Sequence, residues 1–68
     1  MVNVQRLKAK ILLAGYTQKT LAPDMKMSLN TLNAKVNGRA PIYCDEALRF
    51  CNVLGINDPI EKVEIFLT

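Results

Sequence analysis

The chain has 68 residues, of which half are apolar and 22% are charged, with a net charge of +3. This length allows one domain with a single small core over residues 1–68, and the apolar content is that of a globular chain rather than a disordered one. The most membrane-like run is only Ile11 to Ala14, whereas about 20 apolar residues are needed to span a bilayer, and the first residues do not form a signal peptide. We therefore expect a cytoplasmic protein without a membrane partner.

The sequence offers little for enzyme or metal chemistry. The chain has no histidine, and its two cysteines, Cys44 and Cys51, stand seven residues apart in one helical pattern. That spacing is about 10 Å along a helix, beyond disulfide reach, and it leaves no zinc-binding set. No carboxylate pair is placed for acid–base work. We therefore expect that the protein is not an enzyme and that it binds no cofactor, metal or small-molecule substrate.

The charge is unevenly distributed. Residues 1–39 carry seven basic side chains against the single acid Asp24, whereas residues 40–68 carry two basic side chains against five acids. The asymmetry favours an anionic partner for the N-terminal part, with ordinary solvated charge as the alternative.

The first predicted helix runs from about Val4 to Ala14 and is capped by Asn3. Its core stripe has helical spacing and consists of Val4, Leu7, Ile11 and Ala14. The basic residues on its other faces are either solvent charges or phosphate contacts: Arg6, Lys8 and Lys10.

A second helix is predicted to start after Thr17, which can cap it. The residues expected to face inward are Leu21, Ala22 and Met25. Pro23 lies inside this helix and lacks an N–H group, so the helix should be bent or shortened. After a tight joint at Lys26 and Met27, Ser28 caps a third helix over Ser28–Asn37, which Gly38 ends. Two short helices joined this way are typical of a helix-turn-helix.

The third helix has two distinct faces at 100° per residue. Its apolar stripe consists of Leu29, Leu32 and Val36. The other face carries no acid and consists of Asn30, Asn33, Ala34 and Asn37. Such a face suits the major groove of DNA, because asparagine can bond adenine N6 and N7 together. The alternative is a solvated face that happens to use asparagine.

Residues 38–68 are predicted to form a loop over Gly38–Pro41 and two further helices. The fourth runs from about Cys44 to Leu54, with Glu46 reaching back to a free N–H near Tyr43. Its core stripe is Ala47, Phe50, Cys51 and Leu54. The fifth is short, from Pro59 to Glu64, after the cap Asp58. The apolar tail, residues 65–68, should pack on the core or on another subunit, and Phe66 is the tail residue we expect to be buried.

Taken together, these features resemble the phage Cro and repressor (XRE-like) helix-turn-helix family over most of the chain. The resemblance rests on Gln18, Leu21-Ala22, Met25, Met27, Ser28, Leu32, Asn37-Gly38, Asp45-Glu46-Ala47, Leu54-Gly55-Ile56, Asp58-Pro59 and Glu64-Ile65-Phe66. It implies an all-α, five-helix, lambda-repressor-like DNA-binding domain. Three positions depart from the family pattern: Pro23 replaces a helix former, Lys26 stands where glycine usually adopts the left-handed conformation, and Lys35 occupies a place that is often apolar.

The resemblance also implies a function. The chain would be a sequence-specific transcriptional regulator of phage or prophage origin, binding double-stranded DNA at a palindromic operator as a homodimer, with the third helix in the major groove. Gln18 would contact the phosphate backbone and brace that helix. The residues that would face the groove or backbone are Ser28, Leu29, Asn30, Asn33, Ala34 and Asn37. From charge we add three phosphate candidates, Lys19, Lys35 and Arg39. Apolar surface near the fifth helix is the candidate dimer surface. The alternative function is a helical protein-interaction module, antitoxin-like or adaptor, without its own operator.

Overall fold

Five α-helices make up the part of the chain that the structure, a computed structural model, describes, namely residues 2–67. Their bounds are α1 Val4–Leu13, α2 Gln18–Asp24, α3 Leu29–Val36, α4 Cys44–Leu54 and α5 Pro59–Phe66. The predicted all-α, five-helix architecture is confirmed. Because each helix is short, its stability depends on packing an apolar face against its neighbours.

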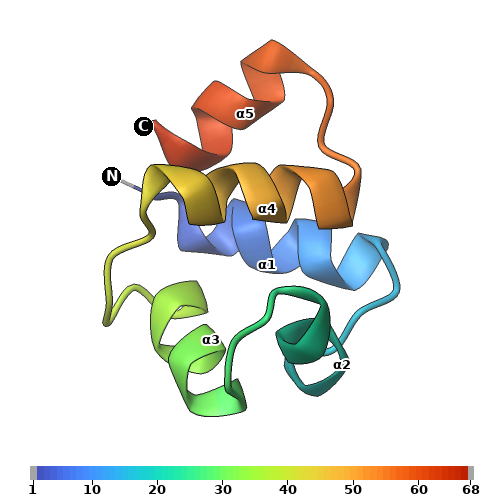
Figure 1. Cartoon of the computed structure of the whole chain (residues 1–68). Helices are drawn as coiled ribbons and strands as arrows, with labels where there is room; N and C mark the ends of the chain where they lie inside the picture. The colour runs from blue at the N-terminus through green and yellow to red at the C-terminus, as the bar shows by residue number, and fades with distance from the viewer. Residues whose placement is uncertain (1, 68) are drawn as a thin grey trace.

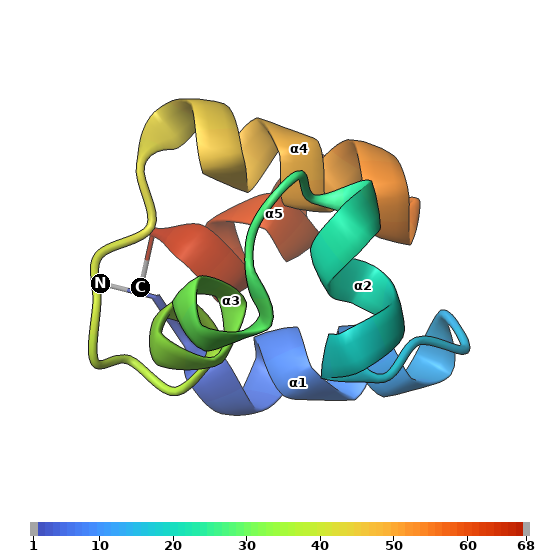
Figure 2. The ribbon, with the colours of Figure 1, turned by 60° about the horizontal axis from the view of Figure 1, so that its bottom comes forward.

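The helices α2 and α3 lie at one end of the molecule and α5 lies at the other (Figure 1). Between them, α1 and α4 flank the core, and the view turned by 60° brings α2, α3 and the turn that joins them to the front (Figure 2). The closest helix contacts are those of α2 with α3 and of α1 with both α3 and α5. The α2–α3 pair is therefore presented on a scaffold made by the other three helices.

The predicted caps explain where the helices begin. The side chains of Asn3, Thr17 and Ser28 each accept a hydrogen bond from a main-chain N–H three residues later, and Asp58 accepts one two residues later. At the start of α4 the acceptor lies inside the helix and the donor before it: Glu46 Oε1 accepts from the main-chain N–H of Tyr43 at 2.9 Å. These local bonds satisfy donors that a helix start leaves free.

Two predicted helix ends were wrong. The first helix stops at Leu13, with Ala14 as an exposed cap, so Ala14 does not join the core stripe. The fifth helix continues two residues beyond Glu64 to Phe66. The continuation follows from packing, because Ile65 is buried and its carbonyl accepts a hydrogen bond from Asn3 N at 2.6 Å.

The core contains residues from every helix and from the loop before α5. Its buried apolar members are Leu7, Ile11, Leu21, Ala22, Met25, Leu32, Val36, Phe50, Cys51, Ile56 and Ile65. Two predictions about this core were wrong. The tail residue that is fully buried is Ile65, whereas Phe66 is half-buried and stacks on Phe50 with ring centroids 6.2 Å apart. Leu29 is 45% exposed rather than part of the apolar stripe of α3, because it lies in the first turn, beyond the edge of the core.

The turn between α2 and α3 has a lysine in the conformation that the family's glycine usually adopts. Lys26 has a φ of 56°, the left-handed conformation that glycine adopts more easily. The main-chain N–H of Met27 donates to Ala22 O at 3.0 Å, which closes the end of α2. The helix has only seven residues and ends one residue after Pro23, as expected of a shortened helix. Arg49 of α4 donates to Met25 O at 2.9 Å and so ties this turn to the scaffold.

Candidate nucleic-acid interface

A hydrogen bond between side chains joins α2 to α3. The amide nitrogen of Asn33 in α3 donates to Oε1 of Gln18, the first residue of α2, over 2.7 Å. The resemblance implied that Gln18 braces the third helix, and the structure contains this brace. Both side chains are half-buried, so solvent competes for the bond only in part. The predicted contact of Gln18 with a phosphate stays a prediction.

The first turn of α3 is the most accessible part of the predicted groove-facing surface. Ser28, Leu29, Asn30 and Thr31 are all exposed. The Ser28 hydroxyl is occupied as a cap, accepting from Thr31 N at 3.1 Å and donating to the Thr31 hydroxyl at 2.9 Å. Among residues 2–67, Asn30 makes no side-chain hydrogen bond. Its amide is therefore free to bond a ligand, and exposed Leu29 beside it offers an apolar contact.

The second half of the same surface is occupied by contacts within the chain. Asn33 also accepts, through Oδ1, a hydrogen bond from the Arg39 guanidinium. The Asn37 side chain donates to the main-chain carbonyl of Asn33 at 2.8 Å. Half-buried Ala34 contributes its carbonyl, which accepts from the main-chain N–H groups of Arg39 and Ala40 at 2.8 and 3.2 Å. The predicted face is thus divided into a free N-terminal half and a bonded C-terminal half.

The structure does not leave Lys35 accessible to a phosphate, which corrects our prediction. Its side chain is 8% exposed, and Nζ donates to Glu46 Oε1 at 2.8 Å and to Pro41 O at 2.9 Å. The same ammonium lies 4.9 Å from the centre of the Tyr43 ring, a cation–π distance. A lysine at a position that is often apolar was the sequence signal for this arrangement, because such a residue needs a partner when it is buried.

Glu46 is the partner of that ammonium, and its ionisation reflects the contact. Burial alone would raise the pKa of Glu46, but the hydrogen bonds from Lys35 and from the Tyr43 main chain, with the charges of Lys35 and Arg49, lower it further than burial raises it. The carboxylate form is therefore favoured, and α3 is held to α4 by an ion pair.

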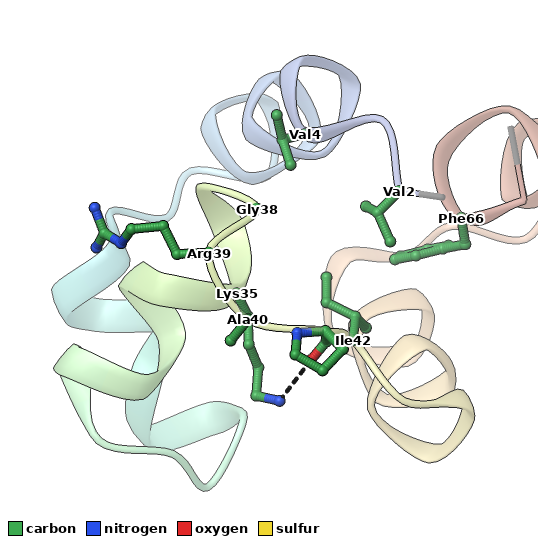
Figure 3. A pocket seen from close by; sticks show the side chains of 9 residues that line it. Val2, Val4, Lys35, Gly38, Arg39, Ala40, Ile42 and Phe66 are labelled. Carbon is green, nitrogen blue, oxygen red and sulfur yellow. Dashed lines mark hydrogen bonds between the residues drawn. The ribbon is translucent and has the colours of Figure 1, made fainter.

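Lys35 and Arg39 diverge around an open hollow of about 440 Å³ beside the end of α3 (Figure 3). The Arg39 side chain points away from the hollow, whereas Lys35 reaches the carbonyl of Pro41. The apolar side chains that line it come from the N-terminal segment, α1, the α3–α4 loop and α5: Val2, Val4, Ile42 and Phe66. Of the two cations, only Arg39 is thus left accessible from solvent.

Ion pairs leave the uncompensated positive charge on residues 1–39, mostly in and beside α2 and α3. Each of three pairs joins a cation of residues 1–39 to an acid of residues 40–68; they are Arg6–Glu64, Lys10–Glu61 and Lys35–Glu46. Outside these pairs, four cations of residues 1–39 face the single acid Asp24, while Arg49 and Lys62 balance Asp45 and Asp58. The net charge of +3 therefore belongs to Lys8, Lys19, Lys26 and Arg39 with Asp24, all of them exposed.

Two exposed residues beside the predicted site were missed. Lys26 was considered only for its backbone conformation, yet its ammonium is an accessible cation between α2 and α3. Thr31 lies off the asparagine face on a helical wheel, but it is exposed in the first turn of α3. The free cation at the turn could have been recognised from charge alone.

Apolar side chains are exposed at the opposite end of the molecule. Ile60, Val63 and Leu67 of α5 and its C-cap are 69%, 49% and 73% exposed. Their spacing of three and four residues places them on one stripe of the helix. We call these three residues the outer stripe of α5, a helix that lies at the end of the molecule opposite α2 and α3 (Figure 1).

Three comparisons, with protein-family models, with curated proteins and with solved structures, found no match to this chain. Within residues 2–67 no helix is long and apolar enough to cross a membrane. The same residues contain no group of three or more His, Cys, Asp or Glu side chains placed to hold a metal ion.

Proposed function

We propose that this chain is a sequence-specific DNA-binding transcriptional regulator of the phage Cro and repressor kind, which places α3 in the major groove of its operator. One observation carries the proposal. The exposed first turn of α3 offers a free asparagine amide and no carboxylate, on the part of the molecule that holds the uncompensated positive charge. The cations of such a surface attract phosphate, and its free amide can form hydrogen bonds with the edge of a base.

The residues fall into two roles under this proposal. Asn30 is the candidate for base contact, and Leu29 beside it suits the methyl group of thymine. The exposed cations nearest these helices, Lys19, Lys26 and Arg39, are the candidates for phosphate contact. Phosphate contacts fix the orientation of the protein on the duplex, and base contacts select the sequence.

We further propose that two copies bind one palindromic operator, since a single eight-residue α3 reads few bases. Two half-sites lie about 34 Å apart on one side of the duplex. The chain measures 28 × 23 × 20 Å, so one copy is small enough to occupy each half-site. Packing through the outer stripe of α5 would instead direct the two α3 helices away from each other. The surface that suits a dimer is therefore the side beside the end of α3, where Val2, Ile42 and Phe66 line the hollow.

The test is binding to duplex DNA over a series of salt concentrations, measured by fluorescence anisotropy. Affinity should fall steeply with salt, because bound phosphates release counterions. Lys19→Ala should lower the slope of log affinity against log salt by about one. The matched control is Lys62→Ala, which removes the same charge from α5 and should leave the slope unchanged. Absence of binding at low salt, or equal effects of the two variants, would overturn the proposal.

A second function is favoured by the outer stripe of α5. Ile60, Val63 and Leu67 form an exposed apolar surface of the kind that mediates protein contacts. The chain would then be a helical protein-interaction module, antitoxin-like or adaptor, without its own operator. The same salt series separates the two functions, since an interaction module would not bind duplex DNA at low salt.

A further inference from the structure

Asn33 is bonded at both ends of its side-chain amide. Its Nδ2 donates to Gln18 Oε1 at 2.7 Å, and its Oδ1 accepts from the Arg39 guanidinium. Gln18 is the first residue of α2, and Arg39 lies three residues beyond the last residue of α3. A single asparagine therefore connects the start of one helix to the segment that follows the other.

The two asparagines of α3 differ in what their amides have available. An asparagine that reads adenine uses Oδ1 and Nδ2 together. Both atoms of Asn33 already have partners within the chain, so Gln18 and Arg39 set the orientation of its amide. Asn30 is exposed, and its amide has no partner within residues 2–67. Because its amide is free, Asn30 is the better candidate for hydrogen bonding to a base.

The contact with Asn33 restrains the exposed side chain of Arg39. The main chain of Arg39 is held by the hydrogen bond from its N–H to Ala34 O at 2.8 Å. Its exposed guanidinium points away from the hollow toward solvent (Figure 3) and is restrained by Asn33. A guanidinium has five N–H donors, and donors not used by Asn33 suit the oxygens of a phosphate. Gln18 accepts through Oε1, which leaves its Nε2 donors for a second phosphate oxygen.

We propose that Asn33 is a positioning residue rather than a base-reading residue. It holds Gln18 and Arg39 as donors for the phosphate backbone, while Asn30 reads the base edge. This inference rests on the proposed function. It distinguishes two asparagines that the sequence pattern treats alike, and it assigns sequence selection to the first turn of α3.

Asn33→Ala and Asn30→Ala form a matched pair of variants, because each removes one amide from the same helix. Each is compared with the unaltered chain by selection from random duplex DNA and by a salt series on the selected site. Asn33→Ala should weaken binding by about tenfold for selected and random duplexes alike. Its salt slope should fall by about one, since Arg39 is no longer held near phosphate, and the selected sequence should not change. Asn30→Ala should retain the slope and lose the preference at one position in each half-site.

A double-mutant cycle tests whether Asn33 acts through Arg39. If it does, Arg39→Ala and Asn33→Ala should each weaken binding, and the double variant should be little weaker than Arg39→Ala alone. Thermal unfolding of each variant separates this effect from a loss of folded protein. A selected sequence that changes in Asn33→Ala with the slope retained, or fully additive losses in the cycle, would overturn the inference while leaving the proposed function intact. If the unaltered chain does not bind duplex DNA at low salt, both are overturned.

Discussion

Cations of the N-terminal part contact carboxylates of the C-terminal part in two different environments. Between α1 and α5, Arg6 Nη1 lies 3.2 Å from Glu64 Oε2, with the two side chains 56% and 42% exposed. Between α3 and α4, Lys35 Nζ lies 2.8 Å from Glu46 Oε1, with side chains only 8% and 16% exposed. The two pairs look alike as contacts but differ in how much water surrounds them.

The difference in exposure decides what each pair contributes to the fold. An exposed pair typically stabilises by only about 0–1 kcal/mol, because water screens it and two long side chains must be ordered. A buried pair has given up its hydration, so removing one partner leaves an unpaired charge at a cost of about 3–5 kcal/mol. We infer that α5 is held mainly by its apolar contacts, whereas the position of α3 depends on Lys35 and Glu46.

The largest expected effect is that of breaking the buried pair. Glu46→Ala should lower the free energy of unfolding by about 3–5 kcal/mol, because it leaves the Lys35 ammonium buried and unpaired. It also removes the acceptor of the Tyr43 main-chain N–H. Urea unfolding followed by circular dichroism measures the loss. Replacing both partners, as Lys35→Met with Glu46→Leu, should recover most of it, and a single-variant loss below about 1 kcal/mol would show that the pair is not desolvated.

Ile65→Ala tests the claim that apolar packing holds α5. We expect a loss of about 3 kcal/mol, because Ile65 is fully buried and its truncation leaves a cavity. Leu67→Ala is the control, since Leu67 is 73% exposed in the same segment and should change stability by less than about 0.5 kcal/mol. Equal effects of the two variants in thermal unfolding would mean that Ile65 is not the residue that anchors the helix.

Acid should weaken the buried pair without any substitution. The pKa of Glu46 is lower in the folded chain than its ordinary value of 4.5, so its contribution is complete above that value. The contribution is lost as pH falls through the folded pKa, because the protonated carboxyl no longer carries the charge that pairs with Lys35. Unfolding of the unaltered chain and of Glu46→Gln should therefore differ most near neutral pH and converge in acid. A difference that stays constant from pH 7 into strong acid would contradict this assignment.

A smaller gain is expected at the turn between α2 and α3. Lys26→Gly should stabilise the chain by up to about 1 kcal/mol, since glycine adopts the left-handed conformation of Lys26 without strain. Lys26→Ala provides the control for loss of the charge and should show no such gain, because alanine retains a Cβ atom. A clear loss of stability in Lys26→Gly would mean that the lysine side chain stabilises this turn.

The smallest effect is expected at the exposed pair between α1 and α5. Arg6→Ala should change the free energy of unfolding by less than about 1 kcal/mol, and Glu64→Ala should do the same. High salt should abolish whatever difference remains, because exposed charges are screened. A loss comparable to that of Glu46→Ala would remove the distinction between the two environments.

The sequence alone was sufficient for features that depend on neighbouring residues. Asn3, Thr17, Ser28 and Asp58 mark helix starts, because a cap bonds a main-chain N–H only two or three residues away. The joint at Lys26 was likewise placed between two helical patterns, whereas its left-handed conformation came from the structure. Helical periodicity then predicted most of the core and the five-helix architecture.

Tertiary structure decided the features that depend on residues distant in the chain. Periodicity showed that the tail was apolar, but only packing selected Ile65 over Phe66 for the core and extended α5. The sequence showed Lys35 at a position that is often apolar, and only the position of α4 made it one half of a buried ion pair with Glu46. The asparagine face was equally undivided in the sequence. Gln18 precedes Asn33 by 15 residues in the sequence, and the fold brings its side chain within hydrogen-bonding distance of Asn33. Within residues 2–67, Asn30 has no such neighbour and stays free.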